Sequence, residues 1–235
     1  MRNPPGRSGE ESEGWGMNQA ALIVLGVFAA TASSFYGILV VPQAQIGRLD
    51  QTKIEETGSY YPAVRPGEAQ AGAEVYRANG CVECHTQQVK MKGNGTDFER
   101  GWGRRRTIAQ DYLLDNPVQL GTVRLGPDLA NIGSRQTNAV YHLQHLYNAR
   151  LTMPGSTMPQ YPYLFTKRAL AAGEKASEGA LPSNTEPGFE VVPRPEALAL
   201  VAYLRSLNSE APLYSAPFPL VPTNSTAAAA APSAK

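Results

Sequence analysis

The chain has 235 residues, enough for one domain of ordinary size with additional segments. Its formal net charge is only +1, so charge gives no indication of a nucleic-acid-binding protein. Gly and Pro are plentiful, with 22 and 19 residues, and long alternating runs of β-branched residues are missing. This composition favours a small helical domain with long loops.

The first segments of the chain predict a membrane anchor. Residues 1–16 are polar and carry mixed charge, which predicts a disordered cytoplasmic tail. Residues 17–42 contain no charged side chain and predict a transmembrane helix, because about twenty apolar residues cross about 30 Å of hydrocarbon. The alternative is a signal peptide cleaved at residues 30–32. The apolar run continues to Val41 and its preceding residues are hardly basic, which favours an uncleaved anchor.

One face of the predicted anchor carries small residues. Their three- and four-residue spacing would let another helix approach closely, although Ala and Gly are also common in membrane spans. The residues are Gly26, Ala30, Ser33, Ser34 and Gly37.

A linker over residues 43–66 is expected to lead into a domain over residues 67–210. A helix is predicted over residues 68–79, where small residues and Tyr76 share one stripe. Gly80 is expected to end this helix.

The next five residues, Cys81-Val82-Glu83-Cys84-His85, form a C-x-x-C-H motif, the attachment signature of a c-type haem. Each cysteine sulfur adds to a haem vinyl group, and His85 then lies under the iron as its proximal ligand. A thioredoxin-like pair or half of a zinc site would not explain the adjacent histidine, and the chain has no further cysteine. The motif therefore predicts one covalent haem c through Cys81 and Cys84.

The compartment follows from this chemistry. Haem is attached to such motifs on the outer side of the bacterial cytoplasmic membrane. The domain is therefore expected on the periplasmic side, with the amino terminus inside.

The end of the domain predicts a second amphipathic helix that begins at Pro195 and presents Leu200, Tyr203 and Leu204 on one face. A short helix before the haem motif and an amphipathic helix at the end outline the c-type cytochrome fold, with Gly72 and Tyr203 expected at the helix crossing. The fold class predicted is all-α, a c-type cytochrome domain with one N-terminal transmembrane helix.

The remaining segments are expected to form one more helix, one long loop and a disordered tail. Residues 138–149 predict a third helix, with apolar side chains along one side. Residues 167–192, rich in Ala, Gly, Ser, Glu and Lys, are expected to form an extended surface loop. Residues 211–235 predict a disordered Pro- and Ala-rich tail.

Residue type and spacing alone do not identify the second axial ligand of the iron. Met153 and Met158 both lie in a turn-rich segment that can present a thioether, and spacing does not decide between them. Met91 is too close to the motif to reach the opposite face of the porphyrin. His142 and His145 are alternatives, although a helix histidine is more often structural.

Two further features surround the motif. A haem-ligating histidine needs its other ring nitrogen hydrogen-bonded, and the Pro127 carbonyl in the turn over residues 126–129 is the expected acceptor, unless this is an ordinary Gly-Pro turn. The loop after the motif is basic and is expected to meet haem propionates or an acidic donor, or to be a solvated face. Its cations are Lys90, Lys92, Arg100, Arg104, Arg105 and Arg106.

Longer stretches resemble the membrane-anchored monohaem subunit (subunit II, FixO/CcoO family) of cbb3-type cytochrome c oxidases. The resemblance covers the anchor and roughly residues 67–165. It is carried by residues 80–87, 99–100, 125–133, the sequence HLQHLYNAR over 142–150, and MPQYP over 158–162.

The resemblance implies the remaining functional expectations. In that family the methionine before Pro-x-Tyr-Pro is the axial ligand, which selects Met158. The subunit passes electrons toward a catalytic subunit with haem b, haem b3 and copper, where oxygen is reduced to water. With both axial positions filled, the chain is not expected to be an enzyme alone. The alternatives are an electron-transfer subunit of a nitric oxide reductase or other respiratory complex, a free membrane-tethered cytochrome c, or a gas sensor or peroxidase with a sixth ligand that leaves easily.

Overall fold

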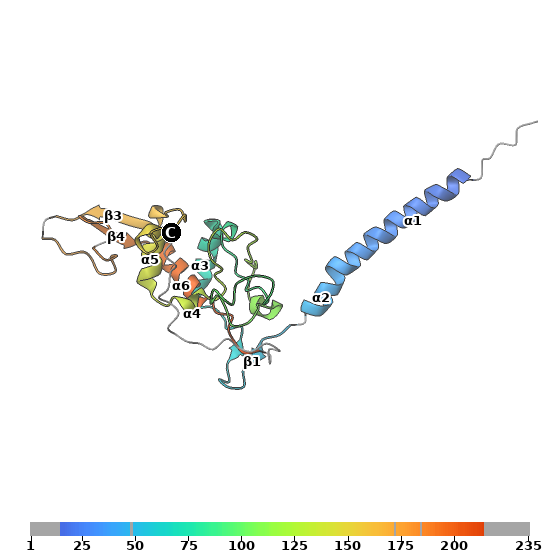
Figure 1. The fold of residues 1–235 in the computed structure, drawn as a ribbon, viewed down its shortest axis with the longest axis horizontal. Helices are drawn as coiled ribbons and strands as arrows, with labels where there is room; N and C mark the ends of the chain where they lie inside the picture. The colour runs from blue at the N-terminus through green and yellow to red at the C-terminus, as the bar shows by residue number, and fades with distance from the viewer. Residues whose placement is uncertain (1–14, 48, 172, 184, 214–235) are drawn as a thin grey trace, which may run out of the picture. The chain divides into compact units, whose positions relative to one another are not determined.

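The computed structural model describes residues 15–47, 49–171, 173–183 and 185–213, which belong to two separate units (Figure 1). The first unit comprises Met1–Asp50 and the second comprises Gln51–Lys235. Most of the two predicted disordered tails, residues 1–14 and 214–235, lies outside the described residues.

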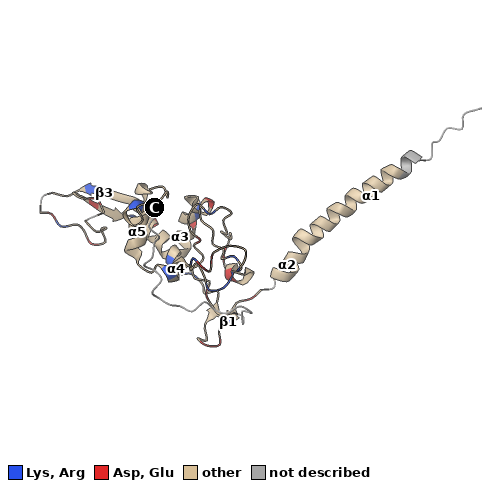
Figure 2. Cartoon of the chain, in the orientation of Figure 1, with Lys and Arg blue, Asp and Glu red and all other residues tan. Residues whose placement is uncertain are grey.

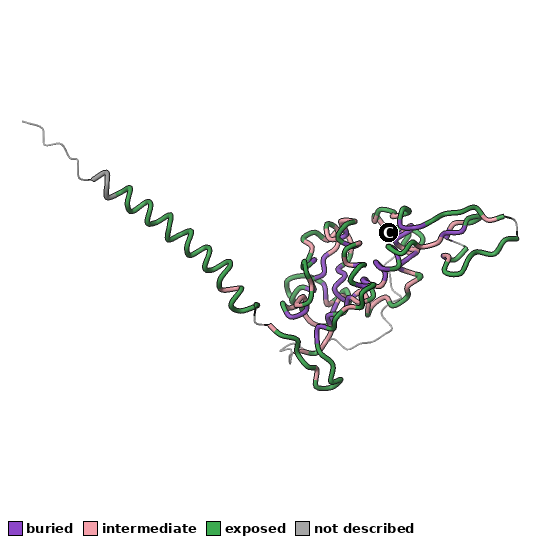
Figure 3. The backbone as a smooth tube through the Cα atoms, turned by 180° about the vertical axis from the view of Figure 1, so that it is seen from behind, coloured by how far each residue is buried: buried purple, intermediate pink, exposed green. Residues whose placement is uncertain are grey.

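The first unit is a single run of helical structure. It consists of helix α1 (Trp15–Phe35), a π-helical turn (Tyr36–Val40) and helix α2 (Val41–Ile46). The stretch Gln19–Ile46 is long and apolar enough to cross a membrane, with a mean hydropathy of 2.0. None of its best apolar window is buried inside the protein, and no charged residue interrupts it (Figures 2 and 3). A single-pass anchor is therefore the assignment that fits this helix.

The helix ends later than the sequence predicted. An end at Pro42 was expected, but helical structure continues to Ile46 and takes up the start of the predicted linker. Pro42 lies in the first turn of α2, directly after the π-helical turn. Because proline lacks an N–H and crowds the preceding carbonyls, it fits where the regular i→i−4 pairing is already interrupted.

The second unit is built around two crossing helices, α3 (Gly67–Ala78) and α6 (Pro195–Ser206). A Cβ atom on Gly72 would lie 1.9 Å from the Ala199 carbonyl oxygen and 2.8 Å from the Tyr203 Cβ, so only glycine permits this approach. The rings of Tyr76 and Tyr203 lie 5.3 Å apart beside the crossing, and both residues are fully buried. The predicted crossing at Gly72 and Tyr203 is confirmed.

A third principal helix, α5 (Ala139–Tyr147), packs on α6 and corresponds to the helix predicted over residues 138–149. Asn138 caps it, since its side-chain oxygen accepts bonds from the amides of Val140 at 2.9 Å and Tyr141 at 3.3 Å. Its apolar side enters the buried core together with α6. The remaining helical pieces are α4 (Ile132–Arg135) and the 3₁₀ turns Cys81–Glu83, Ala109–Tyr112, Ala149–Leu151 and Pro162–Leu164.

Two short antiparallel hairpins complete the unit. Strands β1 (Thr52–Lys53) and β2 (Tyr60–Tyr61) pair within the predicted linker, with Thr52 opposite Tyr61. Strands β3 (Phe165–Ala169) and β4 (Phe189–Pro193) pair with Phe165 opposite Pro193. The described protein is thus mostly helical, and the stricter all-α prediction does not account for these strands.

The second hairpin also corrects the extended loop expected over residues 167–192. Its base is anchored in the core, because Phe165 packs edge-on against Tyr147 at 5.3 Å and Val191 is 2 % exposed. Farther out, Arg168 donates to Glu190 across the strands at 2.7 Å. The two strands contain Phe, Thr and Val, which favour strands, and the core holds one end of the hairpin.

Candidate functional site

The C-x-x-C-H motif forms a tight turn directly after α3. Gly80 has a φ of 65°, a left-handed conformation that glycine adopts readily, and it redirects the chain into the 3₁₀ turn Cys81–Glu83. The His85 amide then donates to the Cys81 carbonyl at 3.0 Å. This turn places two free cysteines, Cys81 and Cys84, and the histidine on one short piece of backbone.

The Cys81 thiol is not suited to thiol–disulfide exchange. The residue is buried, and burial raises the pKa of its thiol to about 11. A reactive redox cysteine has a lowered pKa and a populated thiolate. The thioredoxin-like alternative therefore loses support.

His85 is oriented by the loop that carries Pro127. Its Nδ1 lies 2.8 Å from the Pro127 carbonyl oxygen, so Nδ1 is the protonated nitrogen and Nε2 keeps a free lone pair. The ring lies directly against Gly126, where a Cβ would come within 2.2 Å of the His85 Cε1. The sequence named Pro127 as the acceptor, and the structure brings these two residues together.

The protonation state of His85 suits metal ligation. Burial lowers the pKa of the imidazole, an effect that the hydrogen bond to Pro127 and the charge of Asp128 oppose only in part. The ring is therefore neutral at neutral pH, the form that binds a metal.

The two candidate methionines differ in their surroundings. Met158 is half-buried and packs against the core cluster that contains Cys81, whereas Met153 is 51 % exposed. The segment of Met158 is tied to α5 by the Tyr161 amide, which donates to the Leu146 carbonyl at 3.0 Å. Packing therefore makes Met158 the better fixed of the two methionines.

The two other histidines are engaged in structural contacts. His142 is buried, and its Nε2 lies 2.8 Å from the Gln136 carbonyl oxygen. The Nδ1 of His145 lies 2.5 Å from the Thr152 hydroxyl, and its ring stacks on Tyr141 at 5.7 Å. These contacts account for both side chains without a metal.

The donor set around the motif fits a c-type haem better than a bare metal ion. Among the described residues, no group of three or more His, Cys, Asp or Glu side chains could hold a metal ion. Two free thiols on one turn, followed by a neutral imidazole with Nδ1 already bonded, supply the groups needed for haem attachment and ligation. The Leu125 side chain is 74 % exposed and adds apolar surface to the loop that contacts His85 through Gly126 and Pro127.

Several arginines of the basic loop are engaged within the protein. Arg105 binds Asp111 through both terminal nitrogens, at 2.9 and 2.6 Å. Arg100 stacks over the Trp102 ring at 4.9 Å, and Arg104 lies 3.9 Å from Glu210. The expectation that this loop meets propionates or an acidic donor is not tested by these contacts.

An ion-pair network lies beside the motif and was not predicted from the sequence. It joins Arg124 to Asp97 and Asp128, both of them buried. The four-residue spacing of Arg124 and Asp128 was a weak signal for one of these pairs. No sequence signal connected Asp97 to them, because a long loop brings it in.

The comparisons with known proteins point to one family. Residues 15–181 match the family described as cytochrome C oxidase, mono-heme subunit/FixO. This match covers the apolar helix, the C-x-x-C-H turn, the Pro127 loop and both candidate methionines. No curated protein matches the chain.

Proposed function

Because the chain belongs to the FixO family of mono-heme cytochrome c oxidase subunits, we propose that it relays single electrons to the haem–copper catalytic subunit of a cbb3-type oxidase. That subunit reduces oxygen to water. The observation that carries the proposal is the contact of His85 Nδ1 with the Pro127 carbonyl, next to two free cysteines on the same turn.

The proposed cofactor is one haem c, covalently attached through Cys81 and Cys84, with His85 and Met158 as the axial ligands of iron. When bound, the haem supplies an iron that gains and loses one electron. The turn Cys81–Glu83 fixes the spacing of the two thiols. Support for Met158 over Met153 comes from its packing against the core that contains Cys81.

The protein's own groups have two roles in this function. The Pro127 carbonyl accepts a hydrogen bond from the Nδ1–H of His85, which fixes the ring plane and leaves Nε2 available to hold the iron. His85 and Met158 would together hold the iron, which would leave no position for a substrate. The chain is therefore proposed to be non-catalytic by itself and to act within the oxidase complex with other cytochrome subunits.

The proposed location is the bacterial cytoplasmic membrane, with the haem domain on the periplasmic side. The uncharged helix Gln19–Ile46 supports a single-pass anchor. The side is inferred from where covalent haem attachment takes place.

A haem-stained denaturing gel tests the attachment. The full-length parent is expected to keep its haem after denaturation, and Cys81→Ala with Cys84→Ala is expected to lose it, because both thioether bonds are gone. Met158→Leu is the matched control, since it alters ligation and leaves both thioether bonds in place. Haem that stays on the double variant, or a parent without haem, would refute the proposal.

A further inference from the structure

The backbone around His85 is held on two sides by hydrogen bonds between distant segments. The Gly126 amide donates to the Cys84 carbonyl at 3.0 Å, and the Leu129 amide donates to the Thr86 carbonyl at 2.7 Å. These two bonds lie on either side of the contact between His85 and Pro127. The placement of the Pro127 carbonyl therefore depends on how firmly the two segments are joined.

Asp128 joins the same segments through its side chain. Its Oδ2 accepts from the Thr86 hydroxyl at 2.6 Å and from the Gln88 amide at 2.7 Å, and its Oδ1 accepts from the Ala130 amide at 2.9 Å. The residue is completely buried. A buried carboxylate is costly unless it is paired and hydrogen-bonded, so Asp128 requires a nearby positive charge.

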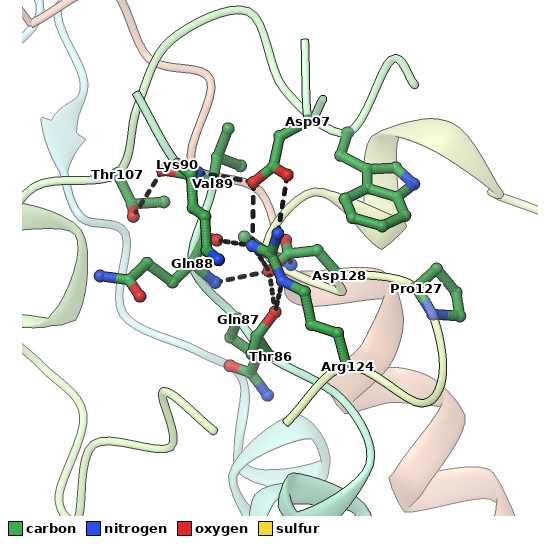
Figure 4. Close-up of polar contacts among 12 residues, drawn as sticks. Thr86, Gln87, Gln88, Val89, Lys90, Asp97, Thr107, Arg124, Pro127 and Asp128 are labelled. Atoms are coloured by element: carbon green, nitrogen blue, oxygen red, sulfur yellow. Dashed lines mark hydrogen bonds and ion pairs between the residues drawn. The ribbon is translucent and has the colours of Figure 1, made fainter. Parts of the chain in front are cut away.

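Arg124 supplies that charge and makes four hydrogen bonds in addition (Figure 4). Its Nε donates to the Thr86 hydroxyl at 2.7 Å, and its two terminal nitrogens donate to the two oxygens of Asp97 at 2.7 and 2.8 Å. Nη2 also donates to the Gln88 carbonyl at 2.5 Å and lies 3.5 Å from Asp128 Oδ2. A planar guanidinium can make this set of contacts at once, whereas the ammonium of lysine cannot.

Asp97 connects a third segment to the other two. Its Oδ2 also accepts from the Lys90 amide at 2.7 Å, and its side chain is 2 % exposed. The Trp102 ring lies against the outer side of this cluster, with the Arg124 guanidinium 5.3 Å from its centre. The network is thus anchored in the protein rather than held by solvent-exposed groups.

We propose that Arg124 is a positioning residue for the proximal histidine. Its guanidinium locks Thr86, which follows His85, to the buried pair of Asp97 and Asp128, and thereby holds Pro127 so that its carbonyl stays on His85 Nδ1. This inference rests on the proposed function, because the orientation of His85 matters only if His85 ligates the iron.

The test measures the His85–Pro127 bond itself. The full-length haem-loaded protein, in detergent micelles and labelled with ¹⁵N-histidine, contains only three histidines. In the reduced state, the exchange rate of the His85 Nδ1 proton with solvent reports how often the bond opens. Arg124→Lys keeps the positive charge and removes the planar guanidinium, and Arg124→Gln removes both. Arg100→Gln is the control, because Arg100 stacks on the same Trp102 ring and bonds Thr96 instead of Asp97.

Both Arg124 variants are expected to exchange about tenfold faster than the parent, which corresponds to a loss of about 1.4 kcal/mol in the closed state. Arg100→Gln is expected to match the parent. Exchange in Arg124→Lys at the parental rate would overturn the inference, because a positive charge without the guanidinium would then be enough to keep the His85–Pro127 bond closed. The Arg124→Lys result decides this even if Arg124→Gln does not fold. Haem missing from the denatured parent would instead refute the proposed function, whereas unchanged exchange with haem in place refutes only the role of Arg124.

Discussion

Gly126→Ala would place a methyl group where the His85 ring now lies. The new Cβ would be 2.2 Å from Cε1, 2.7 Å from Nδ1 and 2.9 Å from Nε2 of His85, far inside normal contact distance. Because Nδ1 is bonded to Pro127 at 2.8 Å, the ring can retreat only by weakening that bond. Overpacking costs about 1–3 kcal/mol and the hydrogen bond about 0.5–1.5 kcal/mol, so we expect the free energy of unfolding to fall by about 1.5–4.5 kcal/mol.

Guanidinium denaturation of the full-length haem-loaded protein in detergent, followed through haem absorbance, measures this loss. Gly155→Ala is the matched control, because a Cβ on Gly155 meets nothing within 4 Å and its backbone φ is not in the left-handed region. That change is expected to be neutral or to stabilise slightly by restricting the unfolded chain. Equal midpoints for the two variants would refute the packing of His85 against Gly126.

Two more predictions concern ligation and acid stability. Met158→His should lower the reduction potential of the haem, since thioether ligation raises this potential relative to bis-histidine ligation, and Met153→Leu should leave it unchanged. A redox titration of both variants checks this. The reverse result would assign Met153 as the ligand. Burial alone would raise the pKa of Asp97, but the hydrogen bonds and charges of Arg124 and Lys90 hold this pKa below its usual range. The stability that ionised Asp97 adds is therefore complete above about pH 4 and is lost as the pH falls further. Asp97→Asn should therefore flatten the acid side of the stability curve, and parallel curves for parent and variant would contradict this.

The parts of the molecule that depend on local sequence were predicted well. The C-x-x-C-H turn, the helix before it and the apolar anchor each follow from neighbouring residues. Gly72 and Tyr203 were also placed correctly at the α3–α6 crossing, because both helices could be recognised and only a glycine admits so close a contact.

The parts that depend on distant contacts were missed. The segment between the strands Phe165–Ala169 and Phe189–Pro193 has a composition typical of a loop, which hid them. They pair because Phe165 and Val191 are held in the core. The contact of Arg124 with Asp97 depends on the path of the intervening loop, which no periodicity describes.

The predicted end of the apolar helix at Pro42 was wrong for a local reason. Pro42 is a helix-ending signal in an ordinary helix. Here the π-helical turn Tyr36–Val40 comes just before it and removes the conflict. A π-helical turn has no sequence signature that would have revealed this.

The burial of Cys81 limits when haem attachment can take place. In the folded domain this side chain is 7 % exposed and its thiol remains protonated. Such burial hinders the access of an attachment enzyme, and a protonated thiol is a poor nucleophile. If Cys81 bears a thioether bond, we therefore expect attachment to take place before the core around Cys81 closes, so that maturation precedes folding.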